Sequence, residues 1–306
     1  MSTGRAIGAV REIRRHPVKS MGGESIRETA IEKRFGVMGD RAWAIRDLTV
    51  GEIRGAKKIP ELLALGARYL AEPQGEASAP IEIDLGDGRR VRSDDAAVCE
   101  RLSERLGRPV QLCSRPPAHE KAHYRRARPI TDPEAEIREA YELLPGEATP
   151  KLMQGPVDFS IVTEYVSPPG TYFDFFDLHL LSTRSLERFA ARVPDSIIDA
   201  RRFRPNFVVD LEGRLASERV AARADASEWP ELEWLGQLFS IGDAAFEITM
   251  PMTRCGMTTH AQAGLPKDPR IMRALYRECS LNLGVAVTVV RGGRVRVGDT
   301  IRIEEG

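Results

Sequence analysis

The residues Phe246-Glu247-Ile248-Thr249-Met250-Pro251-Met252-Thr253-Arg254-Cys255-Gly256 carry a strand-like run directly into a single thiol beside a threonine and an arginine. Pro251 and Gly256 favour a fixed bend on either side of that thiol. A neighbouring cation favours the thiolate, which is the form of cysteine that binds metals or attacks electrophiles. A small buried apolar residue is the alternative role for a lone cysteine. Other parts of the chain must decide between the two.

The composition is that of an ordinary globular protein. The chain has 306 residues, which allows one large domain or two closely packed ones. Hydrophobic residues make up 42% and charged residues 29% of it, which is typical of soluble proteins. The 45 basic and 45 acidic residues cancel. We therefore expect no overall electrostatic attraction to nucleic acid or to a membrane surface.

The four cysteines, Cys99, Cys113, Cys255 and Cys279, lie far apart and form no C-x-x-C pair. This spacing argues against a zinc ribbon, an iron–sulfur cluster and a disulfide-stapled secreted domain. The N-terminal residues contain no apolar run of signal-peptide length, and no uncharged apolar stretch approaches the ~18 residues that suggest a membrane span. We expect a cytoplasmic protein with reduced thiols.

Many short strands separated by turn signals, with a few helices between them, predict an α+β, β-rich fold with barrel-like character. Hairpins are expected around Asp87-Gly88 and Gly242-Asp243. Further strands are expected at residues 6–14, 25–32, 159–165, 173–181, 207–210 and 285–291. Helices are expected at residues 57–65, from Ser93 or Asp94 to near Gly107, at 134–144, from Ser182 or Thr183 to about Arg192, and from Asp268-Pro269 to about Cys279.

Two turns in the first 45 residues offer cations next to flexible backbone. The loop from His16 to Gly23 presents Lys19 and Ser20, an arrangement that suits an anion such as phosphate. A Gly-Asp turn delivers Arg41 to the start of the next strand, so basic side chains could converge. An exposed turn with a solvated lysine is the alternative.

A second possible anion site lies in the other half. The backbone N–H groups of the helix that Ser182 or Thr183 caps could bind an anion. Arg201, Arg202 and Arg204 precede the strand at 207–210, although arginines in such a place are often solvated or paired with acids.

His119 and His123 have the H-E-x-x-H spacing of zinc peptidases, in which the histidines bind zinc and the glutamate acts as general base. Prolines on both sides and the lack of an apolar helical stripe argue against that function. Glu139 and Glu142 are the nearby candidates for a third ligand.

Six motifs in a fixed order resemble a known family, in which a MOSC N-terminal β-barrel domain precedes a MOSC domain (the C-terminal domain of molybdenum cofactor sulfurase). The likeness runs from about residue 5 to residue 303, and its layout is similar to that of the mitochondrial amidoxime-reducing component and its bacterial relatives. It implies a β-barrel-like domain at residues 1–125, packed on a MOSC β-barrel domain at 126–306 with peripheral helices. The motifs are PVKS (17–20), GDR (39–41), HLLST (179–183), RFRPNFVVD (202–210), TRC (253–255) and GGRVRVGD (292–299).

The resemblance implies a molybdenum cofactor, Mo-molybdopterin, bound between the two halves. Cys255 matches the cysteine that ligates molybdenum and is the expected catalytic residue. The family is also linked to pyridoxal phosphate binding, and the resemblance favours the molybdenum cofactor over it. It leaves open which of Arg202 and Arg204 contacts the cofactor. The expected cofactor-binding residues are Lys19, Ser20, Arg41, Ser182, Thr183, Arg202, Arg204, Asn206, Thr253 and Arg254.

The implied activity is reduction of N-hydroxylated or related small molecules. The sequence up to Gly306 lacks the clustered cysteines of a ferredoxin-like domain, so electrons are expected from a separate donor protein. His260 stands where relatives often carry an acid, and Val285-Ala286 where they often carry an aromatic residue, so the substrate could differ; His260 is also a candidate proton donor. The alternatives are a non-enzymatic carrier of the cofactor, or of sulfur on Cys255, and a zinc hydrolase built on the two H-E-x-x-H histidines.

Overall fold

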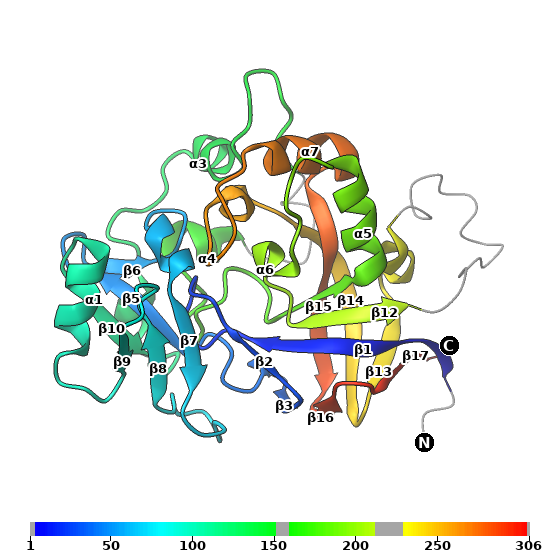
Figure 1. Ribbon diagram of the computed structural model, residues 1–306, viewed down its shortest axis with the longest axis horizontal. Coiled ribbons are helices and arrows are strands. Elements are labelled where there is room, and N and C mark those ends of the chain that lie inside the picture. Colours follow the sequence, from blue (N-terminus) through cyan, green and yellow to red (C-terminus); the bar gives the residue numbers. More distant parts are fainter. Residues whose placement is uncertain (1–3, 151–158, 212–228, 305–306) are drawn as a thin grey trace.

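Seven strands of the described chain close into a barrel that occupies the right-hand side of Figure 1. The computed structural model describes residues 4–150, 159–211 and 229–304. Every pairing around the barrel is antiparallel except that between β11 and β12. In spatial order the strands are β12 (Phe207–Leu211), β11 (Leu178–Ser182), β15 (Asn282–Arg291), β14 (Ala244–Thr253), β13 (Leu238–Ile241), β17 (Thr300–Ile303) and β1 (Arg5–Arg15), which pairs back to β12.

The barrel forms because its strands place alternate apolar side chains on the inner face. Phe207, Phe246, Val287 and Ile301 meet in one buried cluster. β1 completes the ring by pairing with β12 on one side and β17 on the other. The first strand of the chain thus belongs to a barrel whose other strands all come from beyond residue 177. The division at residue 125 stays a prediction.

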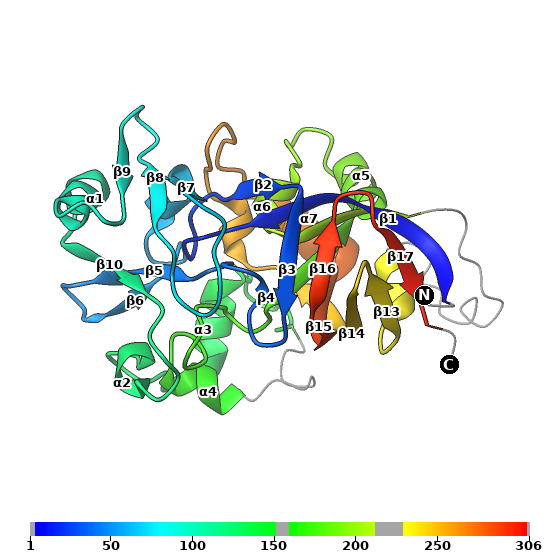
Figure 2. The ribbon, with the colours of Figure 1, turned by 90° about the horizontal axis from the view of Figure 1, so that it is seen from below.

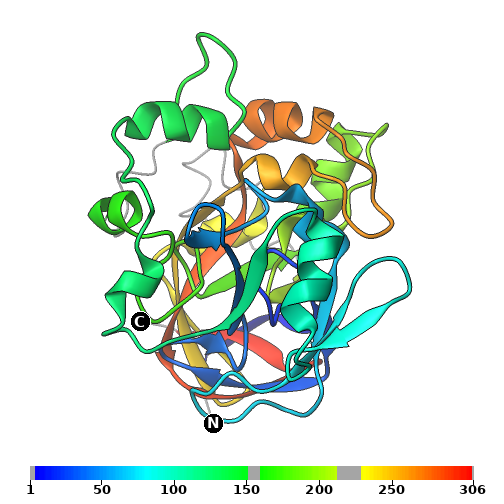
Figure 3. The ribbon, with the colours of Figure 1, turned by 90° about the vertical axis from the view of Figure 1, so that its left-hand side faces the viewer.

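Two three-stranded sheets and a helix form the other half of the molecule, on the left of Figure 1 and facing the viewer in Figure 3. They pack around a second core that includes Val18, Ile59, Leu62 and Leu102. One sheet consists of β10 (Val110–Ser114), β5 (Trp43–Asp47) and β6 (Glu52–Arg54). The other consists of β7 (Gly66–Tyr69), β8 (Ile81–Asp84) and β9 (Arg90–Arg92), and the helix is α1 (Val98–Leu106).

A third small sheet joins the two ends of the sequence. β3 (Glu28–Glu32) pairs with β4 (Gly36–Val37) and with β16 (Gly293–Arg296), and Figure 2 shows β3 and β16 side by side. The short β2 (Glu24–Ile26) extends the barrel sheet beside β1. These pairings hold the loop after β1 and the turn before β5 close to the barrel, where the candidate site lies.

The remaining helices cover the barrel and line its approaches. None of the helices in the described ranges combines the length and apolar character needed to cross a bilayer. They are α2 (Lys121–Tyr124), α3 (Pro133–Ala140), α4 (Phe159–Glu164), α5 (Thr183–Arg192), α6 (Ala200–Phe203) and α7 (Arg270–Cys279), with 3₁₀ turns at Pro60–Ala64, Pro230–Trp234 and Gly256–Thr259.

The sequence-based assignments were wrong in four places. Residues 159–164 are helical, not a strand, and only Leu178–Ser182 of the strand expected at 173–181 forms. The helix expected at 57–65 is a 3₁₀ turn that begins at Pro60. α1 begins at Val98 and its N-cap, Ala97, makes no side-chain bond, so neither Ser93 nor Asp94 caps it.

Candidate functional site

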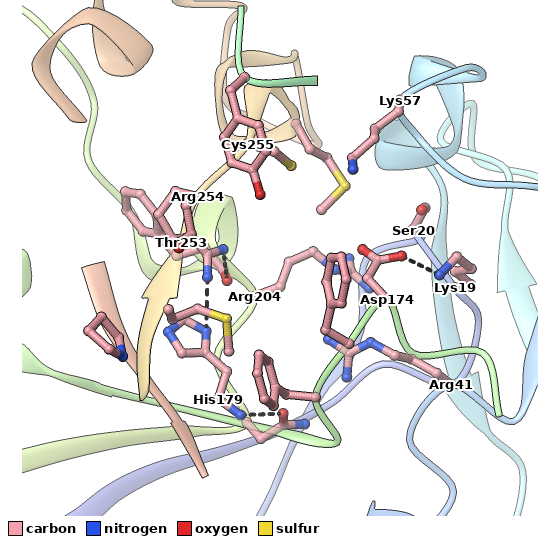
Figure 4. A pocket seen from close by; sticks show the side chains of 18 of the residues that line it. Lys19, Ser20, Arg41, Lys57, Asp174, His179, Arg204, Thr253, Arg254 and Cys255 are labelled. Carbon is pink, nitrogen blue, oxygen red and sulfur yellow. Dashed lines mark hydrogen bonds and ion pairs between the residues drawn. The ribbon is translucent and has the colours of Figure 1, made fainter. Parts of the chain in front are cut away.

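A hollow of about 140 Å³, open to solvent, lies where loops of both halves meet. Figure 4 shows cationic side chains on opposite walls of the hollow with the Cys255 thiol at one end. Eight of the residues expected from the sequence line it: Lys19, Ser20, Arg41, Arg204, Asn206, Thr253, Arg254 and Cys255.

Three of these residues hold an unusual backbone conformation. Ser20, Arg41 and Arg204 have φ angles of 68°, 50° and 53°, in the left-handed region that side chains other than glycine rarely adopt. Each such residue costs of order 1–3 kcal/mol and persists only where its surroundings hold it. Ser20 is held by its Oγ, which accepts a hydrogen bond from the Ala56 backbone N–H at 2.9 Å. Three of the six non-glycine residues with positive φ in the described ranges therefore line the hollow.

A buried carboxylate, Asp40, holds the cationic wall together. It accepts hydrogen bonds from the His16 backbone N–H at 2.6 Å and from Asn206 Nδ2 at 2.9 Å, and it pairs with the Arg41 guanidinium. Burial raises the pKa of Asp40, but the charge of Arg41 and the His16 bonds outweigh it and hold that pKa well below its usual range. Burial and the charge of Arg204 lower the pKa of His16 to about 3, so its ring is neutral.

Lys19 lies opposite an acidic residue that the sequence did not single out. Its Nζ donates to the Tyr172 carbonyl at 2.8 Å and to Asp174 Oδ1 at 2.6 Å. The Asp174 side chain is 58% exposed, so it faces the open hollow. Enclosure raises the pKa of Asp174, but the charges of Lys19 and Lys57 hold it well below its usual range. Asp174 is therefore an ionised counter-charge among several cations.

Strand β14 ends at Thr253, two residues before Cys255, and so positions the thiol at one end of the hollow. Irregularities in its pairing with β15, between Ile248 and Met250 and between Pro251 and Thr253, bend the strand as it leaves the barrel. The Thr253 hydroxyl donates to Asn282 Oδ1 at 2.9 Å. Cys255 then forms the N-cap of the 3₁₀ turn that follows and remains partly exposed.

Arg254 is buried beside the thiol. Its guanidinium donates to the Phe203 carbonyl, and Nη1 lies 3.4 Å from His179 Nδ1. Burial lowers the pKa of Arg254 to about 10, although the charge of Cys255 acts in the opposite direction. Burial and the neighbouring cation Arg254 also lower the pKa of His179 well below its usual value, so His179 is neutral.

Sequence reasoning missed four polar residues of the hollow: Lys57, Tyr141, Asp174 and His179. His179 lies inside the HLLST motif, whose position was the available signal. The other three lie on the turn before Pro60, at the C-terminal end of α3 and in the segment before β11. No local pattern marks them, because only the tertiary fold brings these segments together.

Three expected cofactor contacts lie outside the hollow because their side chains have other partners. The Ser182 hydroxyl caps α5 and donates to the buried Glu231 at 2.7 Å. Thr183 Oγ1 donates to Asp210 at 2.8 Å. Arg202 donates to four backbone carbonyls, those of Ile197, Thr258, His260 and Pro266. It therefore fixes the loop that follows Cys255, while Arg204 faces the hollow.

The H-E-x-x-H residues do not form a metal site. α2 begins at Lys121, so His119 lies outside the helix. Both ring nitrogens of His123 are engaged: Nδ1 lies 3.3 Å from Arg46 Nη2, and Nε2 lies 2.7 Å from the Tyr172 hydroxyl. The part of the chain that the structure describes holds no group of three histidine, cysteine or acidic residues placed to bind a metal. These contacts argue against a zinc site built on His119 and His123. His260 lines an adjoining hollow and not the main one.

The chemistry of the hollow fits an anionic ligand. Five cations, Lys19, Arg41, Lys57, Arg204 and Arg254, line it against one carboxylate. Burial and the neighbouring cation Arg41 lower the pKa of Arg204 to about 9, so its charge is incompletely compensated. Arg204 Nη2 and Arg254 Nε are buried and have no hydrogen-bond acceptor within the described ranges. A multiply charged anion would satisfy these donors and offset the cost of burying the cations.

The fold and the site define a β-barrel protein with a cationic hollow that ends at a thiol. Comparison with known families matches residues 7–97 to the MOSC N-terminal beta barrel domain and residues 171–302 to the MOSC domain. Two domain models of the MOSC family thus match separate parts of the chain, in the order expected from the sequence. MOSC domains are associated with proteins that bind the molybdenum cofactor.

Solved structures similar to the chain share little sequence with it. The YuaD protein of Bacillus subtilis is 20% identical over 43% of this chain and 65% of its own, with a TM-score of 0.33. The YiiM proteins of Escherichia coli and Geobacillus stearothermophilus are 13% and 11% identical, each with a TM-score of 0.29. The match to the Escherichia coli protein covers 43% of this chain, and the match to the Geobacillus stearothermophilus protein covers 42%. Each match covers 55% of the YiiM protein concerned, so this chain spans about half of the length of each. No curated protein matches the sequence.

Proposed function

We propose that the hollow binds the molybdenum cofactor and that the protein uses it to reduce N-hydroxylated or related small molecules. One observation carries the proposal: the fold brings a partly exposed thiol, Cys255, to one end of a hollow whose walls carry five cations from distant segments. Molybdopterin needs both features, because its phosphate is anionic and its metal takes a soft ligand.

The residues divide along the hollow. Lys19, Ser20, Arg41 and Arg204 would hold the phosphate and polar ring of the pterin, with the donors that Arg204 leaves unpaired directed to it. Cys255 would bind the metal. When bound, the cofactor would supply the two-electron redox chemistry of the reaction.

The protein itself supplies orientation and charge neutralisation. Asp40 fixes Arg41 and Asn206, and Arg202 fixes the loop after Cys255. Phe175 and Phe176 line the hollow with Met250, Met252 and Met257 and give its walls an apolar part.

Reduction of an N–OH group to N–H consumes two electrons and two protons and releases water. We propose that a separate donor protein supplies the electrons. The physical requirement on the chain is then a cofactor site that remains accessible from solvent, and the hollow is open.

The first test is cofactor content after expression in a host that makes molybdopterin. We expect oxidised pterin fluorescence together with molybdenum in the wild-type protein. Arg204→Met should lose both, while Arg201→Met, which removes an arginine that pairs with Asp199 outside the hollow, should keep both. Absence of pterin from the wild-type protein would contradict cofactor binding.

The second test separates an enzyme from a carrier. Loaded protein reduced by a viologen dye should convert an N-hydroxylated amidine to the amidine, detected by chromatography. Metal-free protein whose Cys255 accepts sulfur as a persulfide, with no turnover of the amidine by loaded protein, would instead support the sulfur carrier.

A further inference from the structure

Lys57 differs from the other cations of the hollow in having no direct hydrogen-bond or ion-pair partner among the described residues. Burial lowers the pKa of Lys57, but the charges of Cys255 and Asp174 outweigh burial and raise it, and Figure 4 shows the ammonium pointing into the hollow on the side of Cys255. The other four are engaged: Lys19 with Asp174, Arg41 with Asp40, Arg204 with the Met21 carbonyl and Arg254 with the Phe203 carbonyl.

A second unpartnered donor, Tyr141, lies on the same side. Tyr141 is 6% exposed, and its hydroxyl has no hydrogen bond within the described residues. It packs in the hydrophobic cluster against which Cys255 lies, and it lines the hollow. It follows the last residue of α3, in a segment between the two domain matches.

These two donors line the thiol side of the hollow, although the charge of Lys57 also reaches Asp174, the ion-pair partner of Lys19. Lys57 and Met257 also line an adjoining hollow of about 140 Å³, whereas Lys19, Arg41 and Arg204 line only the main one. Lys57 therefore stands where a second molecule could approach the thiol end without displacing a ligand at the phosphate end.

The charges around the adjoining hollow decide where an anion would bind. Glu136, Glu139 and Glu142 line it, and Glu139 pairs with Lys58. These acids disfavour an anion in the outer hollow, whereas the main hollow has five cations against the single described carboxylate of Asp174, so an anion would be held on the main-hollow side of Lys57.

We propose that Lys57 and Tyr141 form a substrate subsite beside Cys255 that binds a negatively charged oxygen, as in a carboxylate or an oxyanion. Both groups present donors, and a charged acceptor makes the strongest hydrogen bonds with such donors. The subsite deepens the proposed function, since it names the substrate of the same site as an anion.

The test uses two alkylating reagents of nearly equal shape on cofactor-free protein. Iodoacetate carries a carboxylate and iodoacetamide a neutral amide; each forms an S–C bond to the thiolate as iodide leaves. The ratio of their rates at Cys255, measured by mass spectrometry of the peptide at one pH, reports whether an anionic oxygen is favoured beside the thiol.

Lys57→Met should lower the iodoacetate to iodoacetamide ratio several-fold, as expected for the loss of one nearby charge in a water-filled hollow. Lys57→Arg keeps the charge and should keep the ratio. Lys58→Met, the matched control, removes a neighbouring lysine that lines the adjoining hollow but not the main one and pairs with Glu139, so it should lower the ratio much less. Tyr141→Phe should lower it.

An unchanged ratio in Lys57→Met, or an equal fall in Lys58→Met, would overturn the subsite, and an unchanged ratio in Tyr141→Phe would remove Tyr141 from it. Molybdenum content separates the subsite from the proposed function. Lys57→Met should retain the metal of the wild type, and loss of the metal would make Lys57 a cofactor contact instead. If the wild-type protein holds no molybdenum, the cofactor proposal fails while the alkylation ratio still decides the subsite.

Discussion

Replacing Asp40 with asparagine removes the one negative charge at the centre of the cationic wall. Asp40 is fully buried, and it accepts hydrogen bonds from His16 and Asn206 besides pairing with Arg41. Asparagine keeps the shape but leaves Arg41 uncompensated next to Arg204. Breaking a buried ion pair typically costs 3–5 kcal/mol, and since asparagine still accepts one hydrogen bond we expect a loss of about 3 kcal/mol.

Urea denaturation at pH 7, read by circular dichroism, measures this loss. The control Asp87→Asn removes an exposed carboxylate that pairs with Arg89 in a turn, and it should leave the unfolding midpoint unchanged. The folded-state pKa of Asp40 is lowered, so its contribution is complete above the unfolded pKa of about 3.9 and disappears as the pH falls below it. The difference between wild type and Asp40→Asn should therefore narrow below about pH 4. A loss under about 1 kcal/mol at pH 7 would refute the reasoning.

Three further predictions follow from the same region. His16 is protonated near pH 6.5 in the unfolded state but only near pH 3 in the folded state, so the free energy of unfolding falls as the pH drops between these values. His16→Asn should reduce the slope of the unfolding free energy against pH by about 1.4 kcal/mol per pH unit in urea titrations. An unchanged slope would contradict this prediction. Gly284→Ala would place a Cβ 2.3 Å from His179 Nε2 in a backbone with a φ of +82°. It should lower the free energy of unfolding by about 2 kcal/mol or more, which a lower urea midpoint would show. An unchanged midpoint would show that the His179 ring can move aside. Arg202→Lys loses most of its bonds to backbone carbonyls and should speed alkylation of Cys255 by iodoacetamide, whereas an unchanged rate would mean that Arg202 does not fix the loop.

The β-rich barrel could be predicted because local signals and the tertiary structure agree. Residues 6–14 and 285–291 alternate as barrel strands require, and β1 and β15 extend only a little beyond them. The hairpin at Gly242-Asp243 has the expected turn residues. Asp132 accepts from the Ala135 N–H as an N-cap should.

Assignment failed where tertiary packing opposes local propensity. The run at 159–164 contains β-branched residues that favour a strand, yet it forms α4, and Ile161 packs against a cluster of three tyrosines. The connection from residue 173 to residue 177 is not a strand; it turns Asp174 toward Lys19.

The site shows the same limit. Ordered motifs identified eight of the lining residues, since each motif marks a turn at the end of a strand. They could not separate Arg202 from Arg204, because the difference lies in backbone conformation: Arg204 adopts a positive φ that turns its side chain from α6 into the hollow, whereas Arg202 remains in the helical turn. No sequence motif marked Lys57 or Tyr141 as a residue of the site, since neither lies in one of the six motifs.

The account depends most directly on Cys255 as the ligand of molybdenum. Metal analysis of wild-type protein and of Cys255→Ala, both expressed in a host that makes the cofactor, tests it, with Cys99→Ala as the control for a cysteine in α1 outside the hollow. We predict stoichiometric molybdenum in the wild type and in Cys99→Ala, and little or none in Cys255→Ala although that protein folds. Equal molybdenum in all three proteins, or none in the wild type, would contradict the account.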